Sequence, residues 1–290
     1  MSNGQPTNNF PVVLTAESAG ASNEDVVDAN VTVVNAMYAE LLDAPEIAPN
    51  ALRSYYVDFY LTQALGGGFA QYVFTAPERE EIDAHVREGL EAMGATAHLD
   101  LFNRAAAAFD ALSDDDADSY LDGDFDAGLD EDGGSAGGAS ESVLELEELD
   151  GEFESLLETE DITALNAAWL RSQEGLLVLD DEQLEVHIAG RVALIPNLEE
   201  RQAEAAEEAL ESAPEFELII RELCDVAGHE LEKITMGDPN YQHNGETILA
   251  WHFTTDQGDF LMVEDDEEAY MISPESREII AAVEFEEADA

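Results

Sequence analysis

The spacing of hydrophobic residues changes once along this chain, and that change constrains the fold more than any other feature. From residue 23 onward apolar side chains recur every three or four positions, as in Val27, Val31 and Val34, which is the spacing of amphipathic helices. After residue 247 the spacing becomes two, which is typical of strands. Four β-rich runs separated by short turns follow: 248–254, 259–264, 269–273 and 279–285. Because turns this short join antiparallel neighbours, the sequence predicts an antiparallel four-stranded meander.

The helical pattern and the strand pattern fall in different parts of the chain, so two domains are predicted within the 290 residues. The fold class is therefore mainly α, with a helical N-terminal domain over residues 23–174 and a smaller α+β domain over residues 175–290. Residues 1–22 are small, polar and rich in turn formers, and we expect a disordered arm there. Residues 113–142 are rich in Asp, Gly and Ser, which predicts a flexible acidic insertion in the helical domain.

The chain carries 68 Asp and Glu residues against 10 Lys and Arg, and Lys233 is its single lysine. Scarce lysine with abundant carboxylates indicates a halophilic protein, because the screening length falls to about 3 Å at 1 M salt and lets carboxylates crowd. So acidic a balance argues against direct binding of nucleic acid, which needs a basic surface. No apolar run approaches the length of a membrane span, so we expect a cytoplasmic protein without membrane contact.

Motifs that carry catalytic or cofactor chemistry are missing from the sequence. It contains no nucleophile elbow, Walker loop, dinucleotide fingerprint or HExxH pair. A calcium loop starting at Asp122 would need Gly at its sixth position and an acid at its twelfth, where the chain has Ala127 and Gly133. Cys224 is the single cysteine, and it falls in an apolar helical pattern typical of a core residue. We therefore predict no enzyme activity, no cofactor and no metal site.

One group of residues in the second domain is a candidate ligand groove: Tyr241, His243, Trp251 and His252. It combines aromatic rings with imidazoles in and before a predicted strand. Because neighbours in a strand alternate, His252 is expected on the face opposite Trp251, either exposed or lining the groove. The spacing matches no metal-ligand motif. An enzyme that uses this groove is an alternative to a non-enzymatic role.

Two segments of the helical domain carry a recognisable signature. The first is Gly67-Gly68-Phe69-Ala70-Gln71-Tyr72-Val73-Phe74, and the second is Leu149-Asp150-Gly151-Glu152-Phe153. They resemble the DNA-mimic protein family, whose helical antirepressor domain has a Gly-Gly-Phe-x-Gln-Tyr-x-Phe signature and a later Leu-Asp-x-x-Phe element. The resemblance covers about residues 31–171. It implies a non-enzymatic helical domain that binds a basic DNA-binding protein, such as a transcriptional regulator, in place of DNA.

The resemblance implies structural roles for the signature residues and a binding role for acids nearby. Gly67 and Gly68 are expected to form a sharp turn, Phe69, Tyr72 and Phe74 to fill the core, and Gln71 to bond to backbone. The candidate partner-binding acids lie on the helix that follows: Glu78, Glu81, Asp83, Glu88 and Glu91. Three of them, Glu81, Glu88 and Glu91, share one side at helical spacing. A solvated helix of a salt-adapted protein would carry the same acids.

Two further alternatives stay open. An immunity- or antitoxin-like module would plug the active cleft of a partner, which is a protein-binding role without imitation of DNA. A homodimer is also compatible with the sequence, which does not determine the oligomeric state. Competition between the partner and duplex DNA separates a DNA mimic from the plug-like alternative.

Overall fold

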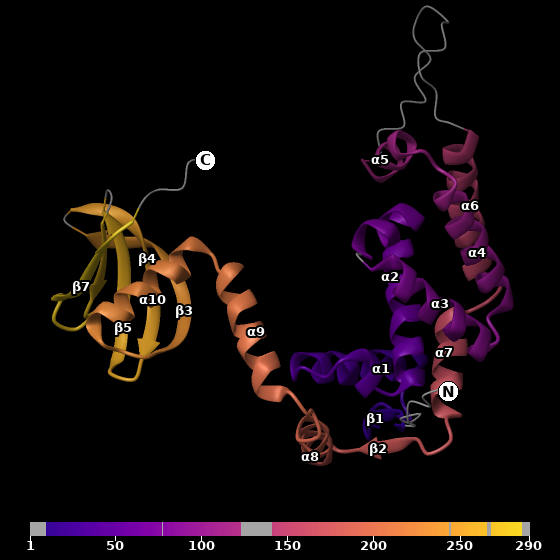
Figure 1. Ribbon diagram of the computed structural model, residues 1–290, viewed down its shortest axis with the longest axis horizontal. Helices are drawn as coiled ribbons and strands as arrows, with labels where there is room; N and C mark the ends of the chain where they lie inside the picture. Colours follow the sequence, from indigo (N-terminus) through magenta and orange to yellow (C-terminus); the bar gives the residue numbers. More distant parts are fainter. Residues whose placement is uncertain (1–9, 77, 123–140, 244, 266–267, 286–290) are drawn as a thin grey trace, which may run out of the picture. The chain divides into compact units, whose positions relative to one another are not determined.

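Helices account for most of the chain up to residue 227 and strands for most of the remainder in the computed structural model (Figure 1), which describes residues 10–76, 78–122, 141–243, 245–265 and 268–285. The prediction of a mainly helical chain with a C-terminal antiparallel sheet is confirmed. The chain divides into two compact units, which we call the helical unit (residues 1–198) and the sheet unit (residues 199–290). Within the described residues, no helix is long and apolar enough to cross a membrane.

The helical unit has two hydrophobic cores that share one long helix. Its elements in chain order are β1 (Val13–Thr15), α1 (Asn23–Ala39), the 3-10 helix η1 (Ala44–Glu46), α2 (Pro49–Thr75), α3 (Arg79–Met93), α4 (Thr96–Asp110), α5 (Asp114–Asp122), α6 (Glu141–Leu157), α7 (Ile162–Arg171), β2 (Leu177–Leu179) and α8 (Asp181–Val192). One core lies among α2–α6, where the Phe102 ring lies edge-on to Tyr60 and Tyr72. The other lies among β1, α1 and α7. Because α2 contributes to both, it joins the two halves of the unit.

A pair of glycines breaks α2. Gly67 and Gly68 depart from helical geometry, and Gly68 has φ 68° and ψ −164°. Glycine adopts a positive φ without the steric penalty that a Cβ brings, so Gly68 allows the helix to change direction here. A second glycine lets two helices approach closely. A Cβ added at Gly89 of α3 would lie 2.8 Å from the Arg53 carbonyl oxygen of α2.

The predicted disordered arm is wrong for residues 10–22. Val12, Val13 and Leu14 are buried, and β1 pairs in parallel with β2, with Val13 opposite Leu177. Each buried aliphatic side chain contributes about 1.5–3 kcal/mol, which offsets the entropy lost when this short segment becomes ordered. Residues 1–9 lie outside the described part of the chain.

The helical unit continues beyond the predicted domain boundary at residue 174. β2 pairs with β1, and Leu184, Ile188 and Val192 of α8 pack against the core that contains α1. These contacts keep residues 175–198 in the helical unit. The predicted insertion over residues 113–142 begins with α5, whose Tyr120 is buried, and residues 123–140 lie outside the described residues.

The sheet unit has an antiparallel sheet with one strand more than predicted. Its elements are α9 (Leu198–Glu211), α10 (Glu215–Ala227), β3 (Leu231–His243), β4 (Glu246–Thr255), β5 (Gly258–Asp265), β6 (Glu268–Ile272) and β7 (Ile279–Glu284). The strand order is β3-β4-β5-β6-β7, so the sheet has five strands rather than four. The additional strand is β3, whose register shifts between Asp238 and Tyr241. Its Gly237, Asp238 and Pro239 are typical of turns, so this segment lacks the alternation of apolar residues that predicts a strand.

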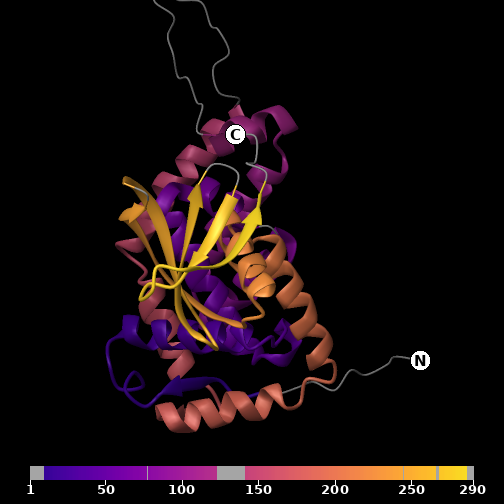
Figure 2. The same ribbon diagram turned by 90° about the vertical axis from the view of Figure 1, so that its left-hand side faces the viewer.

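Both faces of this sheet are covered at its centre. Helix α10 packs on one face (Figure 2), where Ile220 and Leu223 share a core with Phe253 and Met262. On the other face Leu261 and the rest of a small apolar group are buried: Ala250, Val263 and Ile272, with Tyr241 and Tyr270 packed against them. Strand β5 is therefore buried on both sides.

Candidate functional site

The two signature segments, far apart in the sequence, meet at the break in α2. The backbone N–H of Phe69 donates a hydrogen bond to Asp150 Oδ1 at 2.8 Å. Asp150 belongs to α6, and a Cβ added at Gly68 would lie 2.4 Å from its Oδ2. Burial raises the pKa of the Asp150 carboxyl, while hydrogen bonds from Phe69 and Tyr120 lower it. The carboxylate thus accepts an N–H at the start of a helical segment, as an N-cap residue does, and ties α6 to α2.

A second buried carboxylate ties α3 to α2. The Tyr72 hydroxyl donates to Asp83 Oδ1 at 2.7 Å, and Asp83 Oδ2 lies 3.0 Å from Arg87 Nη2 and 3.6 Å from Arg79 Nε. Burial, and then this hydrogen bond, raise the pKa of Tyr72, so its phenol stays protonated. Asp83 is 2% exposed. The prediction that Asp83 contacts a partner is therefore wrong, because its carboxylate faces inward and is engaged within the chain.

The aromatic signature residues divide between the core and the surface. Phe69 and Tyr72 are buried, with ring centroids 5.4 Å apart, whereas Phe74 is 73% exposed. The prediction of a core position is thus wrong for Phe74. Two steps along a helix turn a side chain by about 200°, so Phe74 points away from the core that Tyr72 enters. Gln71 is half-buried, and its Cβ lies 3.0 Å from where a Cβ on Gly67 would stand.

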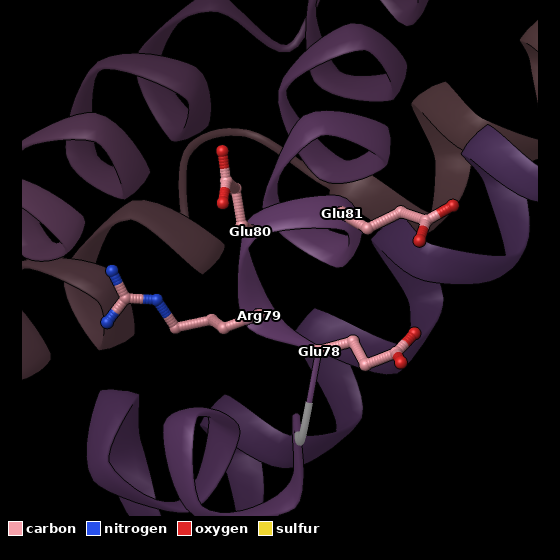
Figure 3. Close-up of a pocket in the computed structure, with 4 residues that line it drawn as sticks. All are labelled: Glu78, Arg79, Glu80 and Glu81. Carbon is pink, nitrogen blue, oxygen red and sulfur yellow. The ribbon is translucent and has the colours of Figure 1, made fainter.

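Arg79 and Arg87 interrupt the exposed acids of α3 in the sequence, and one of these acids is paired with a cation. Figure 3 shows Glu78 and Glu81 pointing to one side of the start of α3 and Arg79 to another, around a shallow hollow. Glu88 forms an ion pair with Arg53 of α2 at 2.7 Å, while Glu91 is exposed. The predicted acids of α3 therefore form a surface of mixed charge.

Helix α6 presents a denser array of carboxylates, which we call the α6 array: Glu145, Glu147, Glu148, Glu152 and Glu154, all exposed. Leu146, Leu149 and Phe153 of the same helix are buried in the core, and α4 runs beside it (Figure 1), so the array stands on a well-packed element. Arg104 Nη1 of α4 donates to Glu152 at 2.9 Å. The sequence carries a signal for this array, because acids alternate with apolar residues at helical spacing over residues 144–154.

The four residues of the predicted ligand groove do not converge. The Trp251 ring stacks on Phe216 of α10, with centroids 3.8 Å apart and planes 8° from parallel. Tyr241 and His243 line a hollow elsewhere on the sheet unit, and neither Trp251 nor His252 lines it. The predicted groove is therefore wrong as a set of four, because Trp251 faces α10.

The described residues offer little for metal or thiol chemistry. Across residues 10–285, apart from the gaps in the description, no three His, Cys, Asp or Glu side chains gather as a metal site. Burial raises the pKa of Cys224 to about 11, so its thiol stays protonated near neutral pH. What the helical unit does offer is fixed negative charge.

Comparison with known proteins gives one finding, and it falls on the helical unit. Residues 45–173 match the profile of the family described as DMP19-like protein. The matched segment runs from η1 to just beyond α7, so it contains the broken α2, Asp150 and the whole α6 array. No curated protein and no solved structure matches the chain. The sheet unit lies outside the matched segment.

Proposed function

We propose that the helical unit binds a basic DNA-binding protein in place of DNA, because residues 45–173 match the DMP19-like family model, in agreement with the resemblance to DNA mimics. The α6 array is the surface through which it does so, and it is the observation that carries the proposal. Mimicry of this kind needs carboxylates on a rigid element, spaced as closely as the DNA phosphates that the partner's Arg and Lys bind.

The axial charge density of the α6 array is close to that of one DNA strand. Glu145 and Glu154 are nine residues apart, which spans about 13.5 Å at a rise of 1.5 Å per residue. Five carboxylates over this length give one charge per about 3.4 Å, the axial rise per phosphate of a single strand. Glu145, Glu148 and Glu152 share one side of the helix, and Glu147 and Glu154 form a second line about 140° around the helix axis.

The cations of the helical unit neutralise little of this charge. All six of its arginines are engaged with groups of the unit itself: Arg53 with Glu88, Arg79 and Arg87 with Asp83, Arg104 with Glu152, Arg171 with Asn23, and Arg191 with the Glu46 carbonyl oxygen. Only Arg104 contacts the α6 array among the residues described. Four of the five carboxylates therefore remain available to a partner.

Competition with duplex DNA tests the proposal. The full chain is immobilised, an extract of the source cells is applied in about 2 M KCl, and a duplex of about 30 base pairs is then added at the same salt, since such affinities depend strongly on ionic strength. We expect the chain to retain a DNA-binding protein that the duplex releases. A partner that saturating duplex leaves in place contradicts DNA mimicry and favours the plug-like alternative.

Two matched variants locate the surface. In the first, Glu145, Glu147, Glu148 and Glu154 are changed to Gln; in the control, Glu200, Glu204, Glu207 and Glu208 of α9 are changed to Gln. Both sets are exposed and helical, both remove four charges, and Gln is a good helix former, so net charge and helix stability stay matched. We expect the α6 variant to lose at least about tenfold in affinity and the control less than about twofold. Equal losses would mean that the interaction is nonspecific attraction to an acidic chain.

A further inference from the structure

A hollow of about 330 Å³ lies on the face of the sheet opposite α10. Tyr241 and His243 of β3 and Tyr270 of β6 line it, and residues two apart in a strand share a face. Met271, which follows Tyr270, packs on the α10 side instead. Arg277, in the turn before β7, and Asp265, at the end of β5, also line the hollow. The remaining lining residues are Gln242, Ile272 and Ile279. A volume of about 300 Å³ or more is typical of sites for small molecules.

Arg277 differs from the other arginines of the chain. Eight of the nine interact with other groups of the protein: Arg53, Arg79, Arg87, Arg104, Arg171, Arg191, Arg201 and Arg221. The Arg277 side chain has no hydrogen bond or ion pair with any residue that the structure describes. In a chain with 68 acidic residues, an unengaged guanidinium beside a hollow is available to a ligand.

The backbone at Arg277 also indicates that this side chain is needed. Its φ is 58°, a value that non-glycine residues rarely adopt. The turn is closed by hydrogen bonds from the Arg277 N–H to the Ser273 carbonyl at 2.9 Å and from the Ser273 N–H to the Glu278 carbonyl at 3.0 Å. Glycine would form this turn more easily, so an arginine at this position strains the backbone. Backbone strain at a lining residue is typical of binding sites.

Aromatic rings form the other side of the hollow. The His243 and Tyr270 rings lie 6.5 Å apart between centroids, with planes 25° from parallel. The Tyr270 hydroxyl donates to Glu268 Oε2 at 2.5 Å, which holds that ring in place. Ring faces of this kind stack on planar ligands. The Asp265 carboxylate adds an acceptor for an N–H or O–H group.

We propose that this hollow binds a small planar anion, in which an aromatic ring stacks on Tyr270 and His243 and a phosphate or carboxylate pairs with Arg277. The guanidinium fork matches both anionic groups with two parallel hydrogen bonds. A nucleoside monophosphate has a planar ring, an anionic group and ribose hydroxyls that could donate hydrogen bonds to Asp265. The net charge of −58 repels free anions, so the ligand needs both its aromatic ring and its anionic group to bind. This site lies in the sheet unit and does not depend on DNA mimicry.

Calorimetric titration of the full chain in about 2 M KCl tests the proposal with four probes: AMP, adenosine, inorganic phosphate and 4-hydroxybenzoate. We expect saturable binding of AMP or of 4-hydroxybenzoate, and the tighter of the two identifies phosphate or carboxylate as the preferred anion. Adenosine and inorganic phosphate, which lack one of the two features, should bind at least about tenfold more weakly than the tighter probe. The proposal would be overturned if none of the four probes bound. It would also be overturned if adenosine and AMP bound equally well and 4-hydroxybenzoate did not bind.

Arg277→Gly removes the guanidinium and suits the turn, so this variant should fold with an unchanged or raised Tm. We expect it to lose at least about tenfold in affinity for the tighter probe. Arg221→Gln is the control, since it removes an exposed arginine that pairs with Glu217 on α10 in the same unit. The control should bind as the wild type does. Wild-type affinity in the Arg277→Gly variant, or the same loss in both variants, would show that Arg277 does not hold the anion.

Discussion

Replacing Gly68 by Ala should destabilise the helical unit, because this glycine meets two separate constraints. Its φ of 68° and ψ of −164° lie in a region confined almost entirely to glycine, and an L residue there costs about 1–3 kcal/mol. The new Cβ would lie 2.4 Å from Asp150 Oδ2, so the carboxylate must move. That movement breaks the hydrogen bond from the Phe69 N–H and leaves the donor unpaired, for about 1–3 kcal/mol more. The expected loss in the free energy of unfolding is on the order of 4 kcal/mol.

Urea unfolding in about 2 M KCl, followed by far-UV circular dichroism, measures this loss. Gly66→Ala is the control: Gly66 is helical, and a Cβ added there meets no atom within 4 Å. Alanine at this position should stabilise the helix by about 0.5–1 kcal/mol. Both variants add the same carbon atom to the same helix, so their difference isolates the geometry of the break.

A double-mutant cycle separates the two constraints. Asp150→Ala removes the hydrogen-bond acceptor and also the atoms that the new Cβ would meet. The variant with both changes should therefore be about 1–2 kcal/mol more stable than the sum of the single losses predicts. Strict additivity, or a Gly68→Ala variant as stable as Gly66→Ala, would refute the role assigned to this junction.

Three further outcomes are expected. Burial, with the charge of Asp28, raises the pKa of Asp58 from 3.8 to about 6. Because the folded pKa lies above the unfolded one, the folded state is most stable below about pH 4, and it loses stability as the pH rises through about 6 and the buried carboxyl ionises. Urea unfolding should show this loss, about 1–2 kcal/mol after solvent screening, in the wild type and not in Asp58→Asn. Asp83→Ala leaves the Tyr72 hydroxyl without its acceptor and removes one of the two partners of Arg79 and of Arg87, so it should lower the free energy of unfolding by about 3 kcal/mol. Glu81→Ala should change it by less than about 0.5 kcal/mol in the same urea titration. Dialysis from about 2 M to about 0.02 M KCl should abolish the far-UV helix signal, since 58 excess negative charges are then unscreened, and a signal indifferent to salt would contradict halophilic adaptation.

Local patterns in the sequence predicted the elements that bury a single face. The three- and four-residue spacing predicted the helices, and the alternation after residue 247 predicted four of the five strands. The elements that were missed depend on distant partners. Strand β1 has three residues and pairs with a strand more than 160 positions away, and β3 is interrupted by turn-forming residues at its register shift. Neither strand has a periodic pattern of apolar residues within its own sequence.

The acids show the same limit. Asp83 has the spacing of the exposed glutamates on α3, yet its inward direction is set by Tyr72 on another helix. Total charge gives no guidance either: 41 of the 68 acidic residues lie in the helical unit and 27 in the much shorter sheet unit, so acids are denser in the sheet unit than in the unit that contains the segment matching the DMP19-like model. A candidate surface is identified by how acids are arranged on a packed helix, which the fold decides.

The junction between Gly68 and Asp150 has a consequence for how such a protein can diverge. Asp150 lies on the same helix as the α6 array, so the hydrogen bond from Phe69 fixes the rotation of that helix about its own axis. Exposed glutamates tolerate replacement, because they contribute little to folding. The buried anchor tolerates little. Descendants of this chain can therefore lose or gain surface charges one residue at a time, and each carboxylate that remains on α6 keeps its own direction relative to α2.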